Sequence, residues 1–511
     1  MTAETLHTKP PRSTRLGVEF RGALGLVGTL SKYLSVAVLF PTALAIGYSE
    51  PFWPFLAAGA IMALLGLALE WIGRDTPAIG FREGFFVVSV TWLAAATLGA
   101  LPYLLSGDPQ LDRPVDAYFE AMSGFTTTGA SILTDIPALD RSLLMWRQFT
   151  QWLGGMGIIV LALAVLPRLR VGGRQLLESE MPGPEVDQLA DRIRSTAQRL
   201  WLLYVALTAA QALILTVFGW TGIDDRMNPF NAVAHAFSTL PTGGFSPEAR
   251  SVEPFAAASQ WVIVVFMALA GMNFALLFRV FVRRNVRAVV RDEEARLYLA
   301  ILALMSLLVA AQLWHEGIQN GEAAFRHGAF QVVSMMTTTG YASTDFIVWP
   351  ALALMIVVGV MLVGGSAGST GGAIKVVRHL LIGKILRREL RQTLHPEAVM
   401  PIRLNGVVLD ERTLRAVAAF VLLYVGLFVA GAGLIALDAA FQGPNLSVFE
   451  AITAAATTLG NVGPGLGFAG PMGSFEPFSD FSTVVMTALM WLGRLEIIPI
   501  IVLLTRGYWR V

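Results

Sequence analysis

The sequence predicts an all-α polytopic membrane protein. Of its 511 residues, 55% are hydrophobic and only 14% are charged, whereas charged residues make up about a quarter of a typical soluble domain. Apolar runs recur along the chain at about the 20 residues that a helix needs to cross a bilayer core. These runs do not alternate in polarity as the strands of a membrane barrel do, so helices are expected.

Ten apolar segments are candidate membrane spans. The first two, at residues 30–48 and 52–72, form a predicted hairpin after a polar N-terminal stretch. Ala43-Leu44-Ala45 imitates a signal-peptidase site, but a second apolar run follows almost at once, so we expect the first span to be retained. The other predicted spans are residues 84–105, 143–166, 200–219, 261–282, 297–313, 349–385 (interrupted), 414–437 and 481–504.

The distribution of basic residues predicts the orientation. Residues 168–199 and 279–296 are rich in arginine, and a third basic segment follows Lys375, whereas residues 438–482 contain no lysine or arginine. The positive-inside rule then puts the basic loops and both termini in the cytoplasm. An even number of spans agrees with this orientation.

The remaining composition excludes several kinds of chemistry. The chain has no cysteine, which rules out disulfides, thiolate metal sites and cysteine nucleophiles. The six histidines are scattered, and His235 is expected to be a packing or hydrogen-bonding residue and not a metal ligand. No catalytic set is recognisable, so we expect no enzyme. A net charge of +1 gives no indication of a nucleic-acid partner.

Four polar glycine turns interrupt the last eight spans. They read FTTTGAS at 125–131, LPTGGFS at 240–246, MTTTGYAS at 336–343 and TTLGNVGPG at 457–465. Aligned on Gly129, Gly243, Gly340 and Gly460, they predict four pseudo-symmetric repeats of helix, pore loop and helix around one central pore. The predicted units are a cytoplasmic segment at 1–29, the transmembrane hairpin at 30–75, and repeats at 76–175, 176–290, 291–395 and 396–511.

Each turn follows an apolar stretch too short to cross a membrane. A helix that ends inside a membrane leaves carbonyl groups that protein, water or an ion must satisfy. Carbonyls gathered around one axis replace the hydration shell of an alkali cation, and glycine allows the positive φ that turns them inward. One such turn alone is more simply an ordinary polar turn, but four in equivalent places favour a pore.

The turns, with MPGPEVDQLADRIRSTAQRLWLLY at 181–204 and HPEAVMPIRLNGVVLDE at 395–411, resemble the Trk/Ktr/HKT superfamily of potassium transporters. The resemblance covers nearly the whole chain and is closest to the bacterial TrkH type, which has the two extra N-terminal spans. It implies that K⁺ is bound at filter positions Thr128, Gly129, Thr242, Gly243, Thr339, Gly340, Leu459 and Gly460. The second and fourth turns depart from Thr-Thr-Thr-Gly, so the symmetry is expected to be approximate.

A second glycine-rich stretch, GGSAGSTGGAIK at 364–375, lies within a predicted span. A phosphate loop needs a Gly-Lys-Ser/Thr ending and a preceding strand, and the stretch at 364–375 has neither. A glycine-rich packing face is the other alternative. Because each glycine costs a helix about 1 kcal/mol relative to alanine, we predict a break instead. The resemblance implies an intramembrane gate formed by Gly364, Gly365, Ser366, Gly368, Ser369, Gly371 and Gly372.

Arg494 lies roughly midway along the last predicted span, where an unpaired arginine costs about 2.5–3.5 kcal/mol. One interpretation is a structural ion pair with Glu496, although residues two apart do not share a helix face. The other, which the resemblance favours, is a cation that faces the pore beside the gate.

The predicted function is K⁺ uptake across the bacterial inner membrane, driven by the membrane potential. The resemblance implies a homodimer with one pore per protomer and a cytoplasmic TrkA-type partner that binds NAD(H) and ATP. K⁺ is the expected transported ion, and we expect no organic cofactor. Membrane lipid is an expected partner, and nucleic acid is not. Alternatives are a Na⁺-coupled or Na⁺-permeable member of the superfamily and a broken-helix secondary transporter of a small solute. Symport with Na⁺ or H⁺ and a pure channel both remain open.

Overall fold

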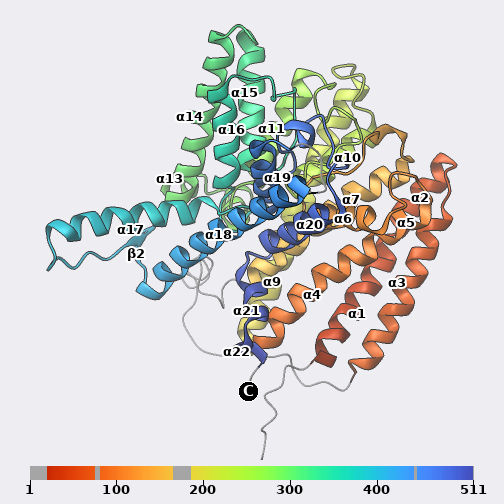
Figure 1. Ribbon diagram of the computed structural model, residues 1–511, viewed down its shortest axis with the longest axis horizontal. Helices are drawn as coiled ribbons and strands as arrows, with labels where there is room; N and C mark the ends of the chain where they lie inside the picture. The colour runs from red at the N-terminus through yellow and green to blue at the C-terminus, as the bar shows by residue number, and fades with distance from the viewer. Residues whose placement is uncertain (1–19, 75–80, 165–185, 442–445, 510–511) are drawn as a thin grey trace, which may run out of the picture.

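The computed structural model describes residues 20–74, 81–164, 186–441 and 446–509, and within them the chain is mainly helical (Figure 1). The predicted boundaries at 75–76 and 175–176 and the basic residues between 168 and 185 lie outside the described residues. The elements are α1 (Phe20–Ala37), α2 (Leu39–Tyr48), α3 (Trp53–Ile72), α4 (Phe81–Gly99), α5 (Leu101–Ser106), α6 (Pro114–Phe125), η1 (Ile136–Ala138), α7 (Arg141–Ala164), α9 (Val186–Trp220), α10 (Pro229–Thr239), α11 (Ala257–Ala270), α12 (Phe274–Phe281), α13 (Arg287–Arg291), α14 (Glu293–His315), α15 (Gly321–Met336), α16 (Ala351–Val363), α17 (Val376–Leu394), β1 (Arg403–Leu404), β2 (Val407–Val408), α18 (Glu411–Phe441), α19 (Val448–Gly460), η2 (Gly467–Ala469), α20 (Asp480–Arg494), α21 (Ile498–Leu504) and α22 (Arg506–Trp509).

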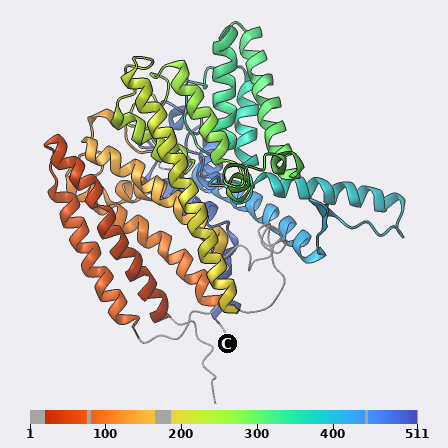
Figure 2. The ribbon, with the colours of Figure 1, turned by 180° about the vertical axis from the view of Figure 1, so that it is seen from behind.

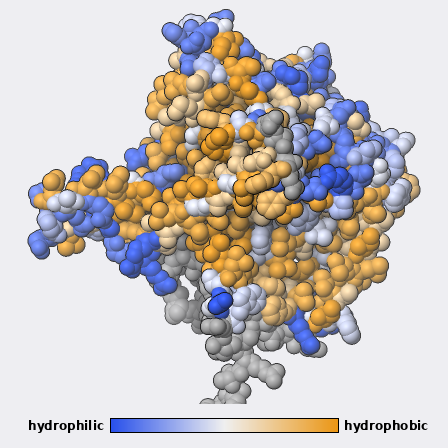
Figure 3. Space-filling model, in the orientation of Figure 1, coloured by the Kyte–Doolittle hydropathy of each residue, from blue (hydrophilic) through white to orange (hydrophobic). Residues whose placement is uncertain are grey.

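The described helices agree with the all-α membrane class. Six are long and apolar enough to cross a membrane, and two sharply bent pairs would bring the number to eight. Apolar side chains cover much of the surface in Figure 3, as expected where helices face lipid. Within the described part of the chain, every predicted apolar segment falls on a helix or on helices separated by a break.

Among the described residues the first helix runs from Phe20, so it extends ahead of the membrane span predicted to start at residue 30. That membrane boundary stays a prediction. Glycines explain the extension, because they let α1 approach the backbone of α3: a Cβ on Gly28 would lie only 2.7 Å from the carbonyl oxygen of Gly66, and one on Gly73 would lie 2.7 Å from Cα of Gly25. The contact therefore continues to the C-terminal end of α3.

Two spans predicted as continuous are broken. The axes of α11 and α12 meet at 111°, and those of α20 and α21 at 115°. Asn273 starts α12, since its side chain accepts hydrogen bonds from the amides of Ala275 and Leu276. At the second break, Glu496 and Ile497 have φ of 55° and 62°, which no helix continues. The third break was predicted: α16 ends at Val363 and α17 begins at Val376. Residues 364–375 between them are called the interrupting segment.

Four short helices, α6, α10, α15 and α19, end inside the bundle. Three of them start with helix-initiating residues. Asn228 caps α10, Ser447 and Glu450 form a capping box on α19, and Pro114 occupies the first turn of α6. Segments far apart in sequence meet around them, as α6 contacts α4, α7 and α20 (Figures 1 and 2).

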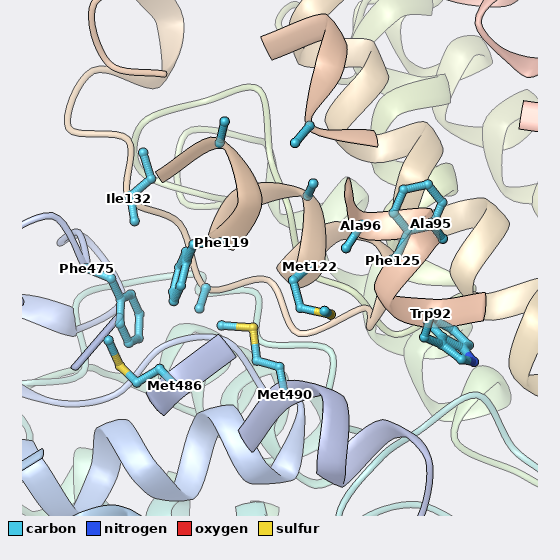
Figure 4. Close-up of a cluster of buried hydrophobic side chains, with 14 of the residues drawn as sticks. Trp92, Ala95, Ala96, Phe119, Met122, Phe125, Ile132, Phe475, Met486 and Met490 are labelled. Atoms are coloured by element: carbon cyan, nitrogen blue, oxygen red, sulfur yellow. The ribbon is translucent and has the colours of Figure 1, made fainter. Parts of the chain in front are cut away.

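The helix α6 is fixed by apolar packing (Figure 4). Phe119 packs against Phe475 with tilted rings whose centroids lie 5.8 Å apart, and Met122 belongs to the same buried cluster as Met490 of α20. On the other side, Trp92 and Ala96 of α4 complete the cluster. The end of α6 is therefore held by its neighbours.

An arm formed by α17 and the β1–β2 hairpin projects from the body (Figure 1). Asn405, at the tip of the hairpin, exchanges hydrogen bonds with Glu293 at the start of α14. Lys384 of α17 pairs with the same carboxylate. The hairpin turn and α17 are thus both attached to the start of α14.

Candidate functional site

The four short helices end in turns with one shared backbone geometry. Each turn has a non-glycine residue of positive φ, and two positions later a glycine of larger positive φ. The first set is Thr127 (51°), Thr242 (58°), Thr338 (61°) and Asn461 (54°). The second set, called the turn glycines, is Gly129 (81°), Gly244 (77°), Gly340 (84°) and Gly463 (110°).

This geometry corrects the alignment made from the sequence. Gly243 and Gly460 were aligned with Gly129 and Gly340, but neither has a positive φ. Gly460 is the last residue of helix α19, and Leu459 lies within that helix. The equivalent glycines are Gly244, one residue later, and Gly463, three residues later. Thr242 corresponds to Thr127 and Thr338 rather than to Thr128 and Thr339.

The turns close the helices in the same way. In each turn, the backbone amide of the residue that precedes the turn glycine donates a hydrogen bond to a carbonyl in the last turn of the helix. This is the pattern of a Schellman cap. The bonds are Thr128 to Ser123 (2.9 Å), Gly243 to Ser238 (2.8 Å), Thr339 to Ser334 (2.8 Å) and Val462 to Thr457 (2.9 Å). The repeated bond fixes the direction in which each chain leaves its helix.

The four turns form a closed ring. A Cβ on each turn glycine would strike the carbonyl oxygen of the residue preceding the next turn glycine. The contacts are Gly129 with Gly243 (2.1 Å), Gly244 with Thr339 (2.0 Å), Gly340 with Val462 (1.9 Å) and Gly463 with Thr128 (2.9 Å). Only glycine leaves room for this approach, so the absence of side chains is what allows the carbonyls to converge.

Three threonines in the ring hold a conformation unfavourable for their type. A β-branched residue with positive φ is an outlier, and such strain collects at functional sites. Thr127, Thr242 and Thr338 all adopt it and are fully buried. The hydroxyls of Thr126 and Thr128 meet at 2.7 Å, as do those of Thr337 and Thr339 at 2.8 Å. These hydroxyl contacts repeat in the first and third turns.

A pocket of about 60 Å³ lies on one side of the ring. This is the side lined by residues that follow the turn glycines in sequence. All four turn glycines line it, together with Arg147. One water needs about 10–15 Å³, so the pocket has room for several water molecules. Among the described residues, no group of three or more acidic or histidine side chains is placed to hold a metal. Backbone carbonyls are the available ligands at the ring.

The interrupting segment lies against the opposite side of the ring. The amide of Gly372 donates to Thr338 Oγ1 at 2.8 Å, and the amide of Ala373 donates to the carbonyl of Gly460 at 3.1 Å. Thr370 Oγ1 donates to the carbonyl of Leu240 at 2.9 Å. The segment therefore contacts the ends of three short helices.

The glycines and serines predicted to form the gate lie in this segment, and the predicted gating residue Arg494 lies outside it. Gly364 has a φ of 79° and Gly368 one of 72°, which explains two of the glycines. A Cβ on Gly371 would lie 3.0 Å from the carbonyl of Thr337, and one on Gly372 would lie 2.4 Å from that of Gly460. The remaining predicted residues, Gly365, Ser366 and Ser369, are also buried.

Arg494 lies at the end of α20 and is 2% exposed. Its Nη1 donates to the carbonyl of Thr370 at 2.7 Å, and its Nη2 to that of Gly154 at 3.5 Å. The suggested pair with Glu496 is wrong, because Glu496 accepts from Arg378 at 2.5 Å and contacts Lys375 at 3.3 Å. Arg494 is thus a buried cation held by backbone carbonyls next to the interrupting segment.

Glu294 is a site residue that the sequence did not indicate. Its Oε1 accepts from the amide of Ala367 at 2.6 Å and from that of Val377 at 3.2 Å. One buried carboxylate on α14 therefore holds the interrupting segment and the start of α17 together. Nothing in the local pattern of two glutamates at a helix start distinguishes this role from an ordinary helix cap.

The missed turn residues did carry a signal. A serine follows the turn glycine after one residue in the first two turns, as Ser131 and Ser246. Alignment on serine would have selected Gly244. In the fourth turn, asparagine is the residue other than glycine that most readily accepts a left-handed conformation, so Asn461 marks the end of α19.

The fold and the site define a polytopic helical membrane protein built around a ring of four helix-ending turns. A model of the TrkH family, described as cation transport proteins, matches residues 54–507. The chain belongs to this family, whose members are ion transporters and not enzymes.

Individual relatives match over nearly the whole chain. The Trk system potassium uptake protein TrkH of Salmonella typhimurium is 36% identical over 498 residues, which cover 96% of this chain and 100% of that protein. TrkG of Escherichia coli is 32% identical over 489 residues, covering 95% and 98%. The crystal structure of the potassium transporter TrkH from Vibrio parahaemolyticus superposes with a TM-score of 0.84 at 34% identity, covering 96% of this chain and 100% of that one.

Proposed function

We propose that the protein takes up K⁺ through the ring of turns, which acts as a selectivity filter. The observation that carries this proposal is the closed ring of carbonyls at Thr128, Gly243, Thr339 and Val462, made possible by the turn glycines. A dehydrated cation exchanges its water for such carbonyls. Relatives named as potassium uptake proteins support K⁺ as the ion.

The interrupting segment and Arg494 together form the gate of this proposed pathway. The segment contacts the ends of the short helices, and a buried guanidinium beside it opposes the passage of another cation. Opening then requires the segment to leave Thr338, Gly460 and Leu240. The contacts of Glu294 stabilise the closed arrangement.

The orientation, partner and assembly are also proposals. The basic stretch around α13 includes Arg283, Arg284 and Arg287, all exposed, which supports a cytoplasmic location for this face in the inner membrane. It suits a cytoplasmic TrkA-type regulatory protein with NAD(H)- and ATP-binding domains. A homodimer with one pore in each protomer completes the proposed assembly.

Growth of cells tests the proposal. A bacterial strain without its own K⁺ uptake systems should grow at low external K⁺ when it expresses this chain together with its regulatory partner. Gly129→Ser at equal membrane abundance should abolish the rescue at low K⁺, because a side chain at this position strikes the carbonyl of Gly243. Equal rescue by both forms would contradict a filter role for the ring.

A further inference from the structure

A buried ion pair between Glu120 and Arg147 stands beside the ring. Glu120 belongs to α6 and Arg147 to α7, and the Nε of the arginine lies 2.7 Å from Oε1 of the glutamate. Their side chains are 0% and 1% exposed. We propose that this pair sets cation entry and selectivity at the pocket, with Arg147 a positioning residue for the first two turns. The inference rests on the proposed uptake function.

The pair ties two turns of the ring together. Arg147 Nη2 donates to Ser131 Oγ at 3.2 Å, and Nη1 donates to the carbonyl of Ser246 at 3.4 Å. Each serine lies two residues beyond a turn glycine. The planar guanidinium forms both bonds while it pairs with Glu120, which a lysine ammonium lacks the fork to reproduce. The guanidinium also lies 4.1 Å from the ring centroid of Phe245.

Glu120 completes the same unit. Its Oε1 accepts from Ser131 Oγ at 3.0 Å, and its Oε2 accepts from the amide of Ile132 at 3.1 Å. The chain that leaves the first turn is thus fixed by a carboxylate from the helix that enters it.

The corresponding positions on the other short helices carry no acidic group. His235 contacts Ser246 Oγ at 3.1 Å, and Gln331 accepts from the amide of Ser343 at 3.3 Å. On α19 the position holds Ala454. The equivalent contacts in the second and third turns are therefore made without a carboxylate. The first turn has one because Arg147 needs a negatively charged partner.

The charge of Arg147 has to be cancelled because of where it lies. It lines the same pocket as the four turn glycines, along with Glu248. An uncompensated positive charge there would repel an entering cation, and the low dielectric around buried groups strengthens the effect. The carboxylate of Glu120 removes this repulsion while the guanidinium keeps its positioning bonds.

The two roles are separable with four variants of the full-length protein in liposomes. Rb⁺ flux should be measured against Rb⁺ concentration at low and high ionic strength, together with the K⁺/Na⁺ preference. Glu120→Gln leaves a lone cation, and Arg147→Gln leaves a lone anion. Arg147→Lys keeps the charge without the fork. Arg113→Gln, which breaks an exposed pair with Asp480, is the control and should match the wild type.

We expect Glu120→Gln to raise the half-saturating Rb⁺ concentration roughly three- to tenfold at low salt, and less at high salt. Arg147→Gln should lower it. Arg147→Lys should leave it within about twofold while lowering the K⁺/Na⁺ preference, because the charge stays and the two turns are no longer tied.

Equal shifts in Glu120→Gln and Arg147→Gln, or an unchanged preference in Arg147→Lys, would overturn the inference. Should Glu120→Gln fail to give monodisperse protein, Arg147→Lys alone decides. Absence of Rb⁺ flux in the wild type would instead count against the proposed uptake function.

Discussion

The backbone amide of Gly372 donates a 2.8 Å hydrogen bond to Oγ1 of Thr338 and so joins the interrupting segment to the third turn of the ring. Both residues are fully or almost fully buried. The side chain at 338 belongs to a strained threonine with a φ of 61°. The proposed gate and the proposed filter therefore share a direct contact.

Thr338→Val removes this acceptor at constant shape. A buried amide without a partner costs about 1–3 kcal/mol, which favours an open segment whose amide meets water. We expect Rb⁺ flux through the isolated protein to rise roughly fivefold or more, since 1.4 kcal/mol is tenfold in an equilibrium. Thr338→Ser keeps the hydroxyl and should behave like the wild type. Equal flux in the two variants would show that the bond does not hold the segment.

Arg494→Ala should increase Rb⁺ flux and weaken its dependence on the regulatory partner. The guanidinium both holds Thr370 and places a fixed positive charge near the segment, so its loss lowers two barriers to a cation. We expect the K⁺/Na⁺ preference to change far less than in Gly129→Ser. Arg494→Lys keeps a charge and should retain part of the block. Lost preference with unchanged flux would assign Arg494 to the filter instead. Size-exclusion profiles in detergent check that each variant is folded.

Alanine substitutions at Gly463 and Gly460 test which glycine of the fourth turn belongs to the ring. A Cβ on Gly463 would need a φ of 110° and would lie 2.9 Å from the carbonyl of Thr128. A Cβ on Gly460, at the end of α19, meets nothing closer than 3.1 Å, a side-chain methyl of Val462. Gly463→Ala should therefore lower the K⁺/Na⁺ preference by about tenfold, on the order of 1.4 kcal/mol, and Gly460→Ala by little. The reverse order would restore the alignment predicted from the sequence.

Glu294→Gln tests the clamp on the interrupting segment. An amide oxygen is a weaker acceptor than a carboxylate oxygen, so the substitution weakens both bonds to Ala367 and Val377. Basal Rb⁺ flux without the partner should rise several-fold, whereas the K⁺/Na⁺ preference should not change. Glu389→Gln on the exposed part of α17 is the control. Wild-type basal flux in Glu294→Gln would show that Glu294 does not hold the interrupting segment closed.

Most of the fold was predictable because its helices are governed by apolar length. The break at residues 364–375 was predictable as well, since glycine density opposes a helix. The breaks at 271–273 and 495–497 were not, because each lies in a mostly apolar stretch with too few glycines to indicate an interruption. They depend on tertiary contacts, such as the approach of Thr337 to Gly271.

The ring was only half predictable. Gly129 and Gly340 follow three threonines, and the sequence identified them. The second and fourth turns contain several glycines, and only backbone torsions show which of them face the neighbouring carbonyls. The pair of Glu120 and Arg147 was missed for a similar reason: the residues lie on different helices and meet only when α6 packs against α7.

We propose above that the ring of turns conducts K⁺ selectively. The most direct measurement is Rb⁺ uptake into liposomes that contain the purified full-length protein and are loaded with K⁺, so that the outward K⁺ gradient makes the interior negative. We expect Rb⁺ accumulation above that of empty liposomes, suppressed by external K⁺ at concentrations where equal Na⁺ has little effect. No accumulation, or equal suppression by Na⁺ and K⁺, would contradict it.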